Sequence, residues 1–512
     1  MPQQITPFSI TAPGFHGLNL QDSPIGMDSG FALIANNCVI DQSGRVAARK
    51  GWDKAHTSNA QLSTSDVTCI GEVIQTDGTA TIVATGGAYL FKHSGTTLTT
   101  LTYGGGGVAP TISASNWQFC QLNGVGIFWQ RGYDPLIYDP AVSTTTFRRL
   151  NEKTGSLGTV QQANTAISAF GRIWCGDLTS DRNTLYWSDV LTPHIWSGGS
   201  SGSLNLHGVW PKGGDNIVAL AAHNNYLFIF GRYQTLVYSG ATTPSTMALT
   251  DTLEIGCIAR DSVQNTGQDV IFLSDSGVRG VLRTIQENSA PLRDLSMNVR
   301  NELLTDIMAE TLANVKSAYS PTNAFYLLTM PTRNRVYCFD MRSQLPTGAA
   351  RVTTWSVITP KSFWQSSTRK LYIGKAGYIG EYAGYLDDTS EYRISYYTPW
   401  IDFGNPIQTS ILKKILLTVI GATNQSIVFK WAYDFDTTYF SETATISEAY
   451  SVSEYNVAEY NIGQYGGGGS VTTTTVNGSG KGVLIQFGFE AQINDNALSF
   501  QKISIYTKEG RL

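Results

Sequence analysis

Residues 224–240 read NNYLFIFGRYQTLVYSG. This stretch holds an apolar run, a turn, and a second run that ends in Tyr238 just before a small polar residue. Short runs rich in Val, Ile, Thr, Tyr, Phe and Trp and cut by Gly, Asn or Ser are typical of strands joined by tight turns. The stretch therefore predicts two neighbouring strands of one sheet.

The same pattern recurs along most of the chain. It appears at 79–95, 125–140, 170–189, 323–340 and 370–384, and at 269–283 with Leu282 in place of the aromatic residue. The matching positions are Phe91, Tyr138, Trp187, Tyr238, Leu282, Phe339 and Tyr382. They are separated by 47, 49, 51, 44, 57 and 43 residues.

This period indicates a β-propeller. Units of ~40–50 residues with several strands each are the mark of that fold. A single blade cannot bury both faces of its sheet, so the blades stack into a ring. Seven units predict about seven blades. The longest interval contains one predicted helix, at about 294–309, whose single apolar face is formed by Leu295, Val299, Leu303 and Ile307.

Two regions flank the predicted propeller, which we place at 61–389. Residues 1–60 form few periodic strands and are rich in Pro, Gly and Asn, so they predict an extended arm. Residues 390–512 predict a separate β-sandwich. Its strands are expected at 410–421, 426–433, 482–491 and 498–508. The predicted fold class is all-β.

A long insertion interrupts the predicted sandwich at 434–480, and residues 431–480 contain no Lys or Arg. One interpretation is a solvated acidic loop. The other is a projecting β-hairpin whose acidic, Tyr-rich surface lines a channel or forms a tip. The residues concerned are Asp434, Asp436, Glu442, Glu448, Glu454, Glu459, Tyr450, Tyr455, Tyr460 and Tyr465.

Composition limits the possible functions. Of the 512 residues, 35 are Lys or Arg and 39 are Asp or Glu, which gives a net charge of −4, and charged residues make up only 14%. This excludes a charge-rich disordered chain and gives no support to a protein that coats DNA, which would be basic. No secretory signal is visible at the N-terminus. The densest apolar stretch, 415–422, is shorter than a membrane-spanning segment.

No motif predicts catalysis, a cofactor or a metal site. The six cysteines and six histidines are scattered without metal-ligand spacing. Ser200, between Gly198 and Gly202, matches a nucleophile motif, but the pattern predicts no helix after it. Four aspartates are candidates for the paired carboxylates of a glycosidase, although each is also ordinary turn chemistry. They are Asp177, Asp181, Asp189 and Asp275.

The most specific motifs lie in the arm. It contains TAPGFHGLNLQDSP at 11–24 and NNCVIDQSGRVAARKGW at 36–52, and WIDFG occurs at 400–404. These motifs resemble those of the tail nozzle proteins of short-tailed bacteriophages, also called tail tubular protein B or packaged-DNA stabilisation proteins. The positions that carry the resemblance are Ala12-Pro13-Gly14, Gly17-Leu18-Asn19, Asn37, Asp41, Gly44, Arg49-Lys50-Gly51-Trp52 and Lys413-Lys414.

The resemblance implies a virion protein that is assembled in the host cytoplasm and has no catalytic residue. It implies a homohexameric ring below the portal and adaptor proteins, with tail fibres or spikes on its sides. Genomic double-stranded DNA passes through the lumen of such a ring without sequence-specific binding. The basic cluster of the arm is then either a docking site for the adaptor or a neighbouring subunit, or a structural anchor. It consists of Arg45, Arg49, Lys50 and Trp52.

We therefore expect a tail nozzle protein rather than an enzyme. The alternative is a carbohydrate-binding or glycan-cleaving β-propeller that acts as a receptor-binding protein. Paired carboxylates converging in a pocket with several arginines would favour the alternative. Broad apolar side surfaces and a protruding acidic hairpin would favour the nozzle.

Overall fold

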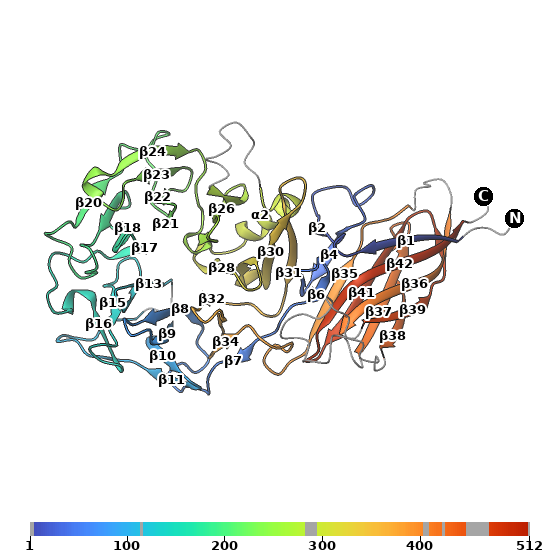
Figure 1. Cartoon of the computed structure of the whole chain (residues 1–512), viewed down its shortest axis with the longest axis horizontal. Coiled ribbons are helices and arrows are strands. Elements are labelled where there is room, and N and C mark those ends of the chain that lie inside the picture. Colours follow the sequence, from blue (N-terminus) through green and yellow to red (C-terminus); the bar gives the residue numbers. More distant parts are fainter. Residues whose placement is uncertain are drawn as a thin grey trace.

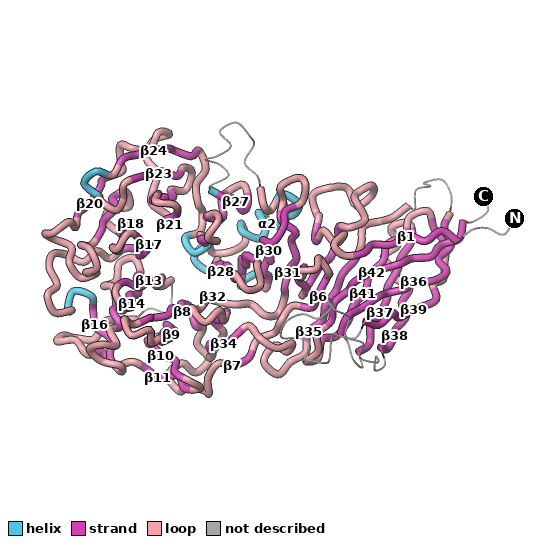
Figure 2. Tube along the Cα trace, viewed as in Figure 1, coloured by secondary structure: helices cyan, strands magenta, loops and turns pink. Residues whose placement is uncertain are grey.

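The computed structural model describes residues 5–112, 116–281, 294–402, 409–421, 425–446 and 471–509. The molecule is elongated, with a ring of sheets at one end and a two-sheet sandwich at the other (Figure 1). Strands dominate both halves, and helices are confined to short segments between them (Figure 2). The predicted all-β fold class is confirmed.

Seven sheets follow one another around the ring in chain order. The first strand of each sheet contacts the first strands of the two neighbouring sheets, and these contacts form a closed cycle. The sheets, written from their first strand outward, are β8 (Val67–Ile74), β9 (Ala80–Gly86), β10 (Tyr89–Ser94), β11 (Thr97–Thr100); β13 (Gln118–Leu122), β14 (Val125–Trp129), β15 (Leu136–Tyr138), β16 (Thr146–Arg149), β12 (Thr102–Tyr103); β17 (Ala163–Ala169), β18 (Arg172–Leu178), β19 (Thr184–Trp187), β20 (Gly202–Asn205); β21 (Ala219–His223), β22 (Tyr226–Phe230), β23 (Thr235–Ser239), β24 (Ala248–Leu253); β25 (Gln264–Asn265), β26 (Val270–Ser274), β27 (Gly277–Gly280); β28 (Lys316–Ser320), β29 (Phe325–Met330), β30 (Arg335–Gln344), β31 (Ala350–Trp355); and β32 (Ser362–Gln365), β33 (Leu371–Gly374), β34 (Ile379–Glu381), β7 (Asp53–Lys54).

The second strands are nearly continuous apolar runs because neighbouring blades cover both faces of each sheet. β22 reads YLFIF and β26 reads VIFLS, and both are almost wholly buried. Apolar clusters fill the spaces between adjacent blades, for example around Phe128 between the first and second blades and around Trp174 between the third and fourth. Fully burying a side chain such as Phe128 contributes about 1.5–3 kcal/mol.

The repeated aromatic position marks the third strand of a blade. Residues at this position lie in β10, β15, β19, β23 and β30, and all are buried; they are Phe91, Tyr138, Trp187, Tyr238 and Phe339. Tyr382 follows directly after β34 and is also buried. Leu282 lies outside the described residues. The propeller prediction, with about seven blades, is confirmed.

The predicted helix is also confirmed, with a later start. α2 (Arg300–Met308) follows a 3-10 turn, η4 (Met297–Val299). Before it, Asp294 Oδ1 accepts hydrogen bonds from the backbone N and the Oγ of Ser296, at 2.8 and 2.6 Å. Such a local bond from a side chain to the backbone competes with helical bonding and holds a turn. Other 3-10 turns are η1 (Leu150–Glu152), η2 (Pro244–Thr246), η3 (Arg260–Ser262), η5 (Leu312–Asn314) and η6 (Pro331–Arg333).

The ring is closed by a strand from the arm. β7 pairs antiparallel with β34 as the outermost strand of the seventh blade, with Lys54 opposite Gly380. Trp52, directly before β7, is buried and packs on this blade. A Cβ at Gly380 would lie 2.5 Å from Trp52 Cε3, so the indole requires a glycine there. The closing strand therefore comes from the opposite end of the sequence to the rest of its blade.

The sandwich consists of two sheets, and one of them continues the sixth blade. Its nine strands run β28-β29-β30-β31-β4-β35-β41-β37-β38, because β4 pairs with both β31 and β35. The facing sheet runs β39-β36-β42-β6-β5, with β1 also on β42 and β40 also on β36. The bounds of these strands are β1 (Ile5–Thr11), β4 (Ile34–Asn36), β5 (Cys38–Ile40), β6 (Val46–Ala48), β35 (Tyr392–Tyr397), β36 (Ser410–Gly421), β37 (Gln425–Tyr433), β38 (Phe440–Ile446), β39 (Val471–Asn477), β40 (Lys481–Gly482), β41 (Ile485–Ile493) and β42 (Leu498–Glu509).

The four strands expected in the sandwich are present as β36, β37, β41 and β42. The arm at 1–60 is threaded through both halves of the molecule. It supplies β1, β5 and β6 to one sandwich sheet, β4 to the other and β7 to the propeller, and adds the small parallel pair β2 (Gly17–Leu18) and β3 (Phe31–Ala32). A single apolar cluster joins Phe15 of the arm, Phe339 of the sixth blade and Phe489 of the sandwich. The propeller and the sandwich therefore share one core.

The two ends of the acidic insertion lie at the sheet edges. β38 pairs with β37, whereas β39 pairs with β36 in the facing sheet. The flanks of the insertion are thus hydrogen-bonded to different sheets. Of the insertion predicted at 434–480, residues 447–470 lie outside the described residues.

We predict that Trp52→Ala lowers the free energy of unfolding by about 3–5 kcal/mol, because it leaves a cavity beneath the closing strand. Lys50→Ala is the matched control, since Lys50 is exposed two residues earlier and its truncation should change stability by less than about 0.5 kcal/mol. Urea unfolding followed by tryptophan fluorescence and circular dichroism measures both. Equal effects of the two substitutions would contradict the importance of the closing strand.

Candidate functional site

A cavity of about 320 Å³ lies on the axis of the propeller. Its lining comes from the first strands of the blades, with residues of β8, β13, β17, β21, β25, β28 and β32, and from η3. Aromatic and amide side chains dominate the lining, among them Trp117, Gln118, Gln264 and Trp364. Its charged residues, among those described, are Arg260, Asp261 and Lys316. A concave site with a few convergent polar groups is the usual setting of a ligand site.

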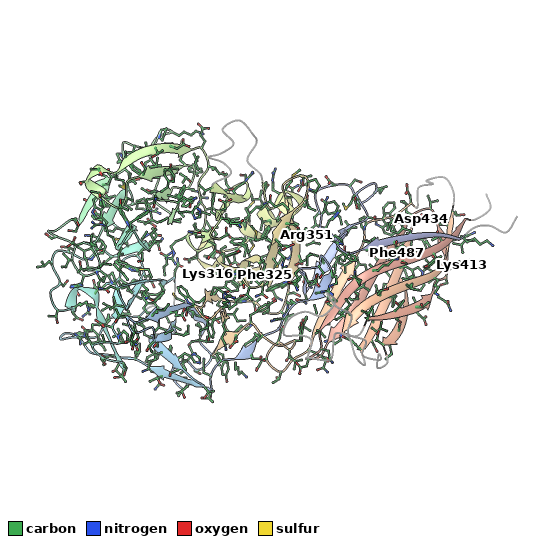
Figure 3. All side chains as sticks on the ribbon, viewed as in Figure 1. Lys316, Phe325, Arg351, Lys413, Asp434 and Phe487 are labelled. Carbon is green, nitrogen blue, oxygen red and sulfur yellow. The ribbon has the colours of Figure 1, made fainter. Side chains whose placement is uncertain are left out.

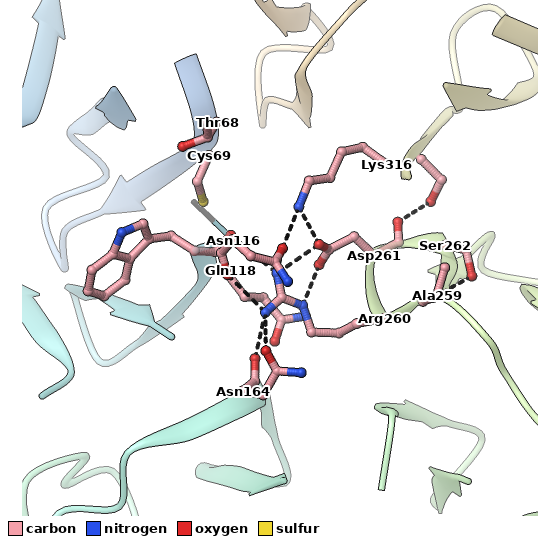
Figure 4. Close-up of polar contacts among 12 residues, drawn as sticks. Thr68, Cys69, Asn116, Gln118, Asn164, Ala259, Arg260, Asp261, Ser262 and Lys316 are labelled. Atoms are coloured by element: carbon pink, nitrogen blue, oxygen red, sulfur yellow. Dashed lines mark hydrogen bonds and ion pairs between the residues drawn. The ribbon is translucent and has the colours of Figure 1, made fainter. Parts of the chain in front are cut away.

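The three charged residues form one network (Figure 4). They lie at or just before the start of a first strand, in η3 and at the beginning of β28. Asp261 accepts hydrogen bonds from Arg260 Nε at 2.8 Å, from Arg260 Nη2 at 2.7 Å and from Lys316 Nζ at 2.5 Å. Asn116 Oδ1 accepts from Arg260 Nη2 at 2.8 Å and from Lys316 Nζ at 2.9 Å. Arg260 Nη1 donates to the backbone O of Asn164 at 2.7 Å. The network therefore joins the second, third, fifth and sixth blades.

Burial and charge act in opposite directions on this network. Burial by itself would raise the pKa of Asp261, but the Arg260 guanidinium and the Lys316 ammonium outweigh it and lower that pKa to about 2. For Lys316, burial is the largest influence and lowers the pKa, against the attraction of Asp261. Perturbed groups in a cavity are typical of functional sites, although structural ion pairs produce them too.

A second buried carboxylate continues the network. Asp177 accepts hydrogen bonds from Arg182 Nε at 2.7 Å, from Asn164 Nδ2 at 2.8 Å and from Arg131 Nη2. Asn164 thus links Asp177 to Arg260. The carboxylate is held by two arginines and an amide, as expected for a buried ion-pair network rather than for a general acid.

The other residues considered for catalysis lie in local turns. Asp181 accepts backbone hydrogen bonds from Asn183 and Thr184, at 3.0 and 3.1 Å. Ser200 Oγ donates to Asp189 Oδ1 at 2.7 Å, and Asp275 is exposed in the turn between β26 and β27. None of these residues lines the axial cavity; each lies in a turn or loop.

The arm cluster is mostly buried within the chain. Arg49 is fully buried, and its Nη1 and Nη2 each donate to Asp387 at 2.7 Å while its Nε donates to Asn37 Oδ1 at 3.1 Å. Arg45 is buried and its Nε donates to Asp41 at 2.5 Å. Trp52 is buried as well, so Lys50 is the exposed member of the four. These contacts anchor the arm, and docking onto another protein stays a prediction.

The described residues of the insertion lie on the sandwich, away from the axial cavity (Figure 3). Asp434 Oδ1 accepts backbone hydrogen bonds from Val483 and Leu484, at 3.0 and 2.8 Å, and so fixes a turn. Asp436 and Glu442 are exposed. Seven predicted residues lie outside the described residues: Glu448, Glu454, Glu459, Tyr450, Tyr455, Tyr460 and Tyr465.

Within the described residues, no group of three His, Cys, Asp or Glu side chains is placed to hold a metal ion. All six cysteines are free and buried. Burial raises the pKa of Cys69, in the cavity lining, to about 12, which makes its thiol a poor nucleophile. Among the described residues, none of the helices has the length and hydrophobicity of a membrane-spanning segment.

Sequence reasoning missed the axial network because its members lie far apart. Asn116, Asn164, Arg260 and Lys316 come from four blades and share no motif. The available signal was a charged residue at the start of a strand in a chain where only 14% of residues are charged. Lys316, the first residue of β28, satisfies that description, whereas Arg260 and Asp261 lie in the 3-10 turn η3 just before β25.

No protein-family model matches the chain, and no curated protein matches it. Among solved structures, it is similar to the extracellular domain of a putative one-component system from B. thetaiotaomicron, at 11% identity and a TM-score of 0.41, over 78% of this chain and 46% of that one. The chain thus spans less than half the length of that domain.

Two further solved structures are similar over most of their own length. YCF48 bound to D1 peptide has 11% identity and a TM-score of 0.37, over 66% of this chain and 98% of that chain. The WD40 domain of Toxoplasma gondii coronin has 9% identity and a TM-score of 0.34, over 68% of this chain and 86% of that chain. At these identities and scores, no function transfers to this chain.

We predict that Asp261→Asn lowers the free energy of unfolding at pH 7 by about 3–5 kcal/mol, because it leaves two buried cations without their carboxylate. Folding lowers the pKa of Asp261, so its stabilisation is present above the unfolded value of 3.8 and is lost as the pH falls through about 2. About 2 kcal/mol of the difference between wild type and variant should therefore disappear between these pH values.

Urea unfolding at a series of pH values measures this difference. Glu254→Gln is the control, because Glu254 is exposed and its ion pair with Lys212 lies at the surface. Parallel stability curves for wild type and Asp261→Asn below pH 4 would contradict the assignment.

Proposed function

We propose that this chain is the tail nozzle protein of a short-tailed phage. In this role it forms part of the DNA-ejection channel below the portal and adaptor, helps to retain the packaged genome and anchors fibres or spikes. It assembles as a homohexameric ring in the virion tail and has no catalytic step.

The observation that carries the proposal is the place of the arm motifs that resemble the nozzle family. They lie where the arm, the propeller and the sandwich meet. Asn37 Nδ2 donates to the backbone O of Arg393 at 2.8 Å, and Arg49 pairs with Asp387. A Cβ at Gly17 would lie 2.5 Å from the backbone O of Val352, which explains the glycine. Asn37, Arg49 and Gly17, three of the motif residues, thus hold the propeller and the sandwich together.

A rigid joint suits a protein that must hold its shape while DNA leaves under pressure. The shared nine-stranded sheet and the shared core oppose movement of the sandwich relative to the propeller. The genome's path in this proposal lies between subunits, since a cavity of about 320 Å³ has the size of a small-ligand pocket. A weakly acidic channel wall would not hold phosphates through counterion release, in keeping with the net charge of −4.

The second candidate is a carbohydrate-binding propeller, and the axial cavity favours it. Trp117 and Trp364 provide aromatic surface, and Gln118 and Gln264 provide amides. Glycan cleavage needs two carboxylates across the bond. Asp261 is the carboxylate in the described lining, so the cavity supports binding better than cleavage.

Electron microscopy of the purified full-length chain, with and without the cognate adaptor ring, tests the nozzle proposal. We expect a six-fold ring with an axial channel, formed on the adaptor. Single propellers that ignore the adaptor would reject the nozzle, and a glycan array would then test the second candidate.

We predict that Lys50→Glu weakens incorporation into tails by about tenfold if the arm docks on the adaptor, because it reverses the exposed charge of the cluster. Deleting residues 1–52 is unsuitable, since these residues supply strands to three sheets. Lys212→Glu, on an exposed lysine of the fourth blade, is the control. Quantitative blotting of purified particles gives the readout, and equal incorporation of both variants would reject docking through Lys50.

A further inference from the structure

The axial cavity contains one positive charge more than its carboxylate balances. Arg260 and Lys316 contribute two positive charges, and Asp261 contributes one negative charge. The side chains of Arg260 and Lys316 are only 4% and 10% exposed, so water compensates the excess poorly. A buried charge without a partner is costly. The cavity beside it has room for a small ligand.

Lys316 has the capacity to bind such a ligand. Its ammonium has three N–H groups, and within the described residues two are used, by Asp261 and Asn116. Arg260, by contrast, directs its guanidinium to Asp261, Asn116 and Asn164 (Figure 4). The free bonding capacity of the network is therefore on the lysine.

Two neutral polar atoms of the lining also lack partners among the described residues. The indole N–H of Trp364 is a buried donor, and the Oε1 of Gln365 is a buried acceptor. Buried polar groups are normally hydrogen-bonded, and exceptions call for a bound molecule or water. A hydroxyl group of a bound ligand can donate or accept and would satisfy whichever of these atoms it reaches, while Phe119 and Trp364 offer apolar contact to its carbon atoms.

We infer that the axial cavity binds a small organic acid carrying a hydroxyl group, with its carboxylate on Lys316. The carboxylate neutralises the excess charge, and charge-assisted hydrogen bonds of this kind are the strong ones. The excess positive charge disfavours a bound cation. A neutral polyol would leave that charge without a counterion. This binding site is independent of the nozzle proposal, which requires no small ligand.

The test is isothermal titration of the full-length protein with glycolate, lactate and malate, in buffer free of other carboxylates. Lactamide is the matched neutral probe, because it differs from lactate in replacing the carboxylate by an amide. We expect at least one hydroxy acid to bind and lactate to bind about tenfold more tightly than lactamide, the ratio of a single charge-assisted hydrogen bond.

Substitution of the lysine locates the binding. Lys316→Met should lower hydroxy-acid affinity by about tenfold or more, whereas Lys316→Arg should retain it by keeping the charge. Lys212→Met is the control, since Lys212 is an exposed lysine that pairs with Glu254 and does not line the cavity. A crystal structure of the wild-type protein with the tightest probe gives a readout that does not depend on whether Lys316→Met folds.

Each outcome decides the inference. Density for the probe against Lys316 and loss of affinity in Lys316→Met would support it. No binding of any hydroxy acid, equal binding of lactate and lactamide, or density elsewhere on the protein would overturn it. Binding of neutral sugars in the cavity in place of acids would also overturn it, and would favour the carbohydrate-binding propeller instead.

Discussion

The structure depends on the pairing of β7 with β34. Each blade needs a neighbour on both faces to bury its apolar residues, so an open ring would expose two whole faces. The chain removes that exposure by bringing residues 53–54 back to the last blade. The same segment is preceded by Trp52, which packs between the sixth and seventh blades, and by Arg49, which pairs with Asp387 in the connection from the seventh blade to the sandwich. One segment of the arm, residues 49–54, thus closes the ring and contacts the connection to the sandwich.

Several of the few charges of this protein form buried ion pairs, and one of these, Arg49 with Asp387, joins distant parts of the chain. Arg49 with Asp387, Arg351 with Asp340 and Arg260 with Asp261 are all largely buried pairs. Buried ion pairs contribute little net stability when both partners are present, but losing one partner is costly. We expect them to disfavour alternative pairings among the blades, because a mispaired blade would leave a buried charge without its partner. In a repeat protein, that discrimination has particular value.

The axial network and the arm cluster illustrate two uses of such charges. In the arm, each of the three guanidinium nitrogens of Arg49 donates a hydrogen bond, and the residue serves as an anchor. On the axis, two cations share one carboxylate beside an open cavity. The first arrangement supports a rigid joint and so the proposed role in a tail. The second leaves an excess positive charge next to a cavity, and a bound anion would neutralise that charge.

The sequence by itself determined the local elements. The strands, their grouping into about seven units, the buried aromatic residue that recurs at the third strand of most blades and the apolar face of α2 all follow from short-range alternation and spacing, which the backbone geometry of strands and helices imposes. Only the tertiary structure decided which strand closes the ring, how the arm divides between three sheets and which charges share the axis. These depend on residues such as Lys54 and Gly380, or Asn116 and Lys316, that are distant in the chain. Their pairing leaves no periodic trace in sequence, because it is set by the packing of whole blades.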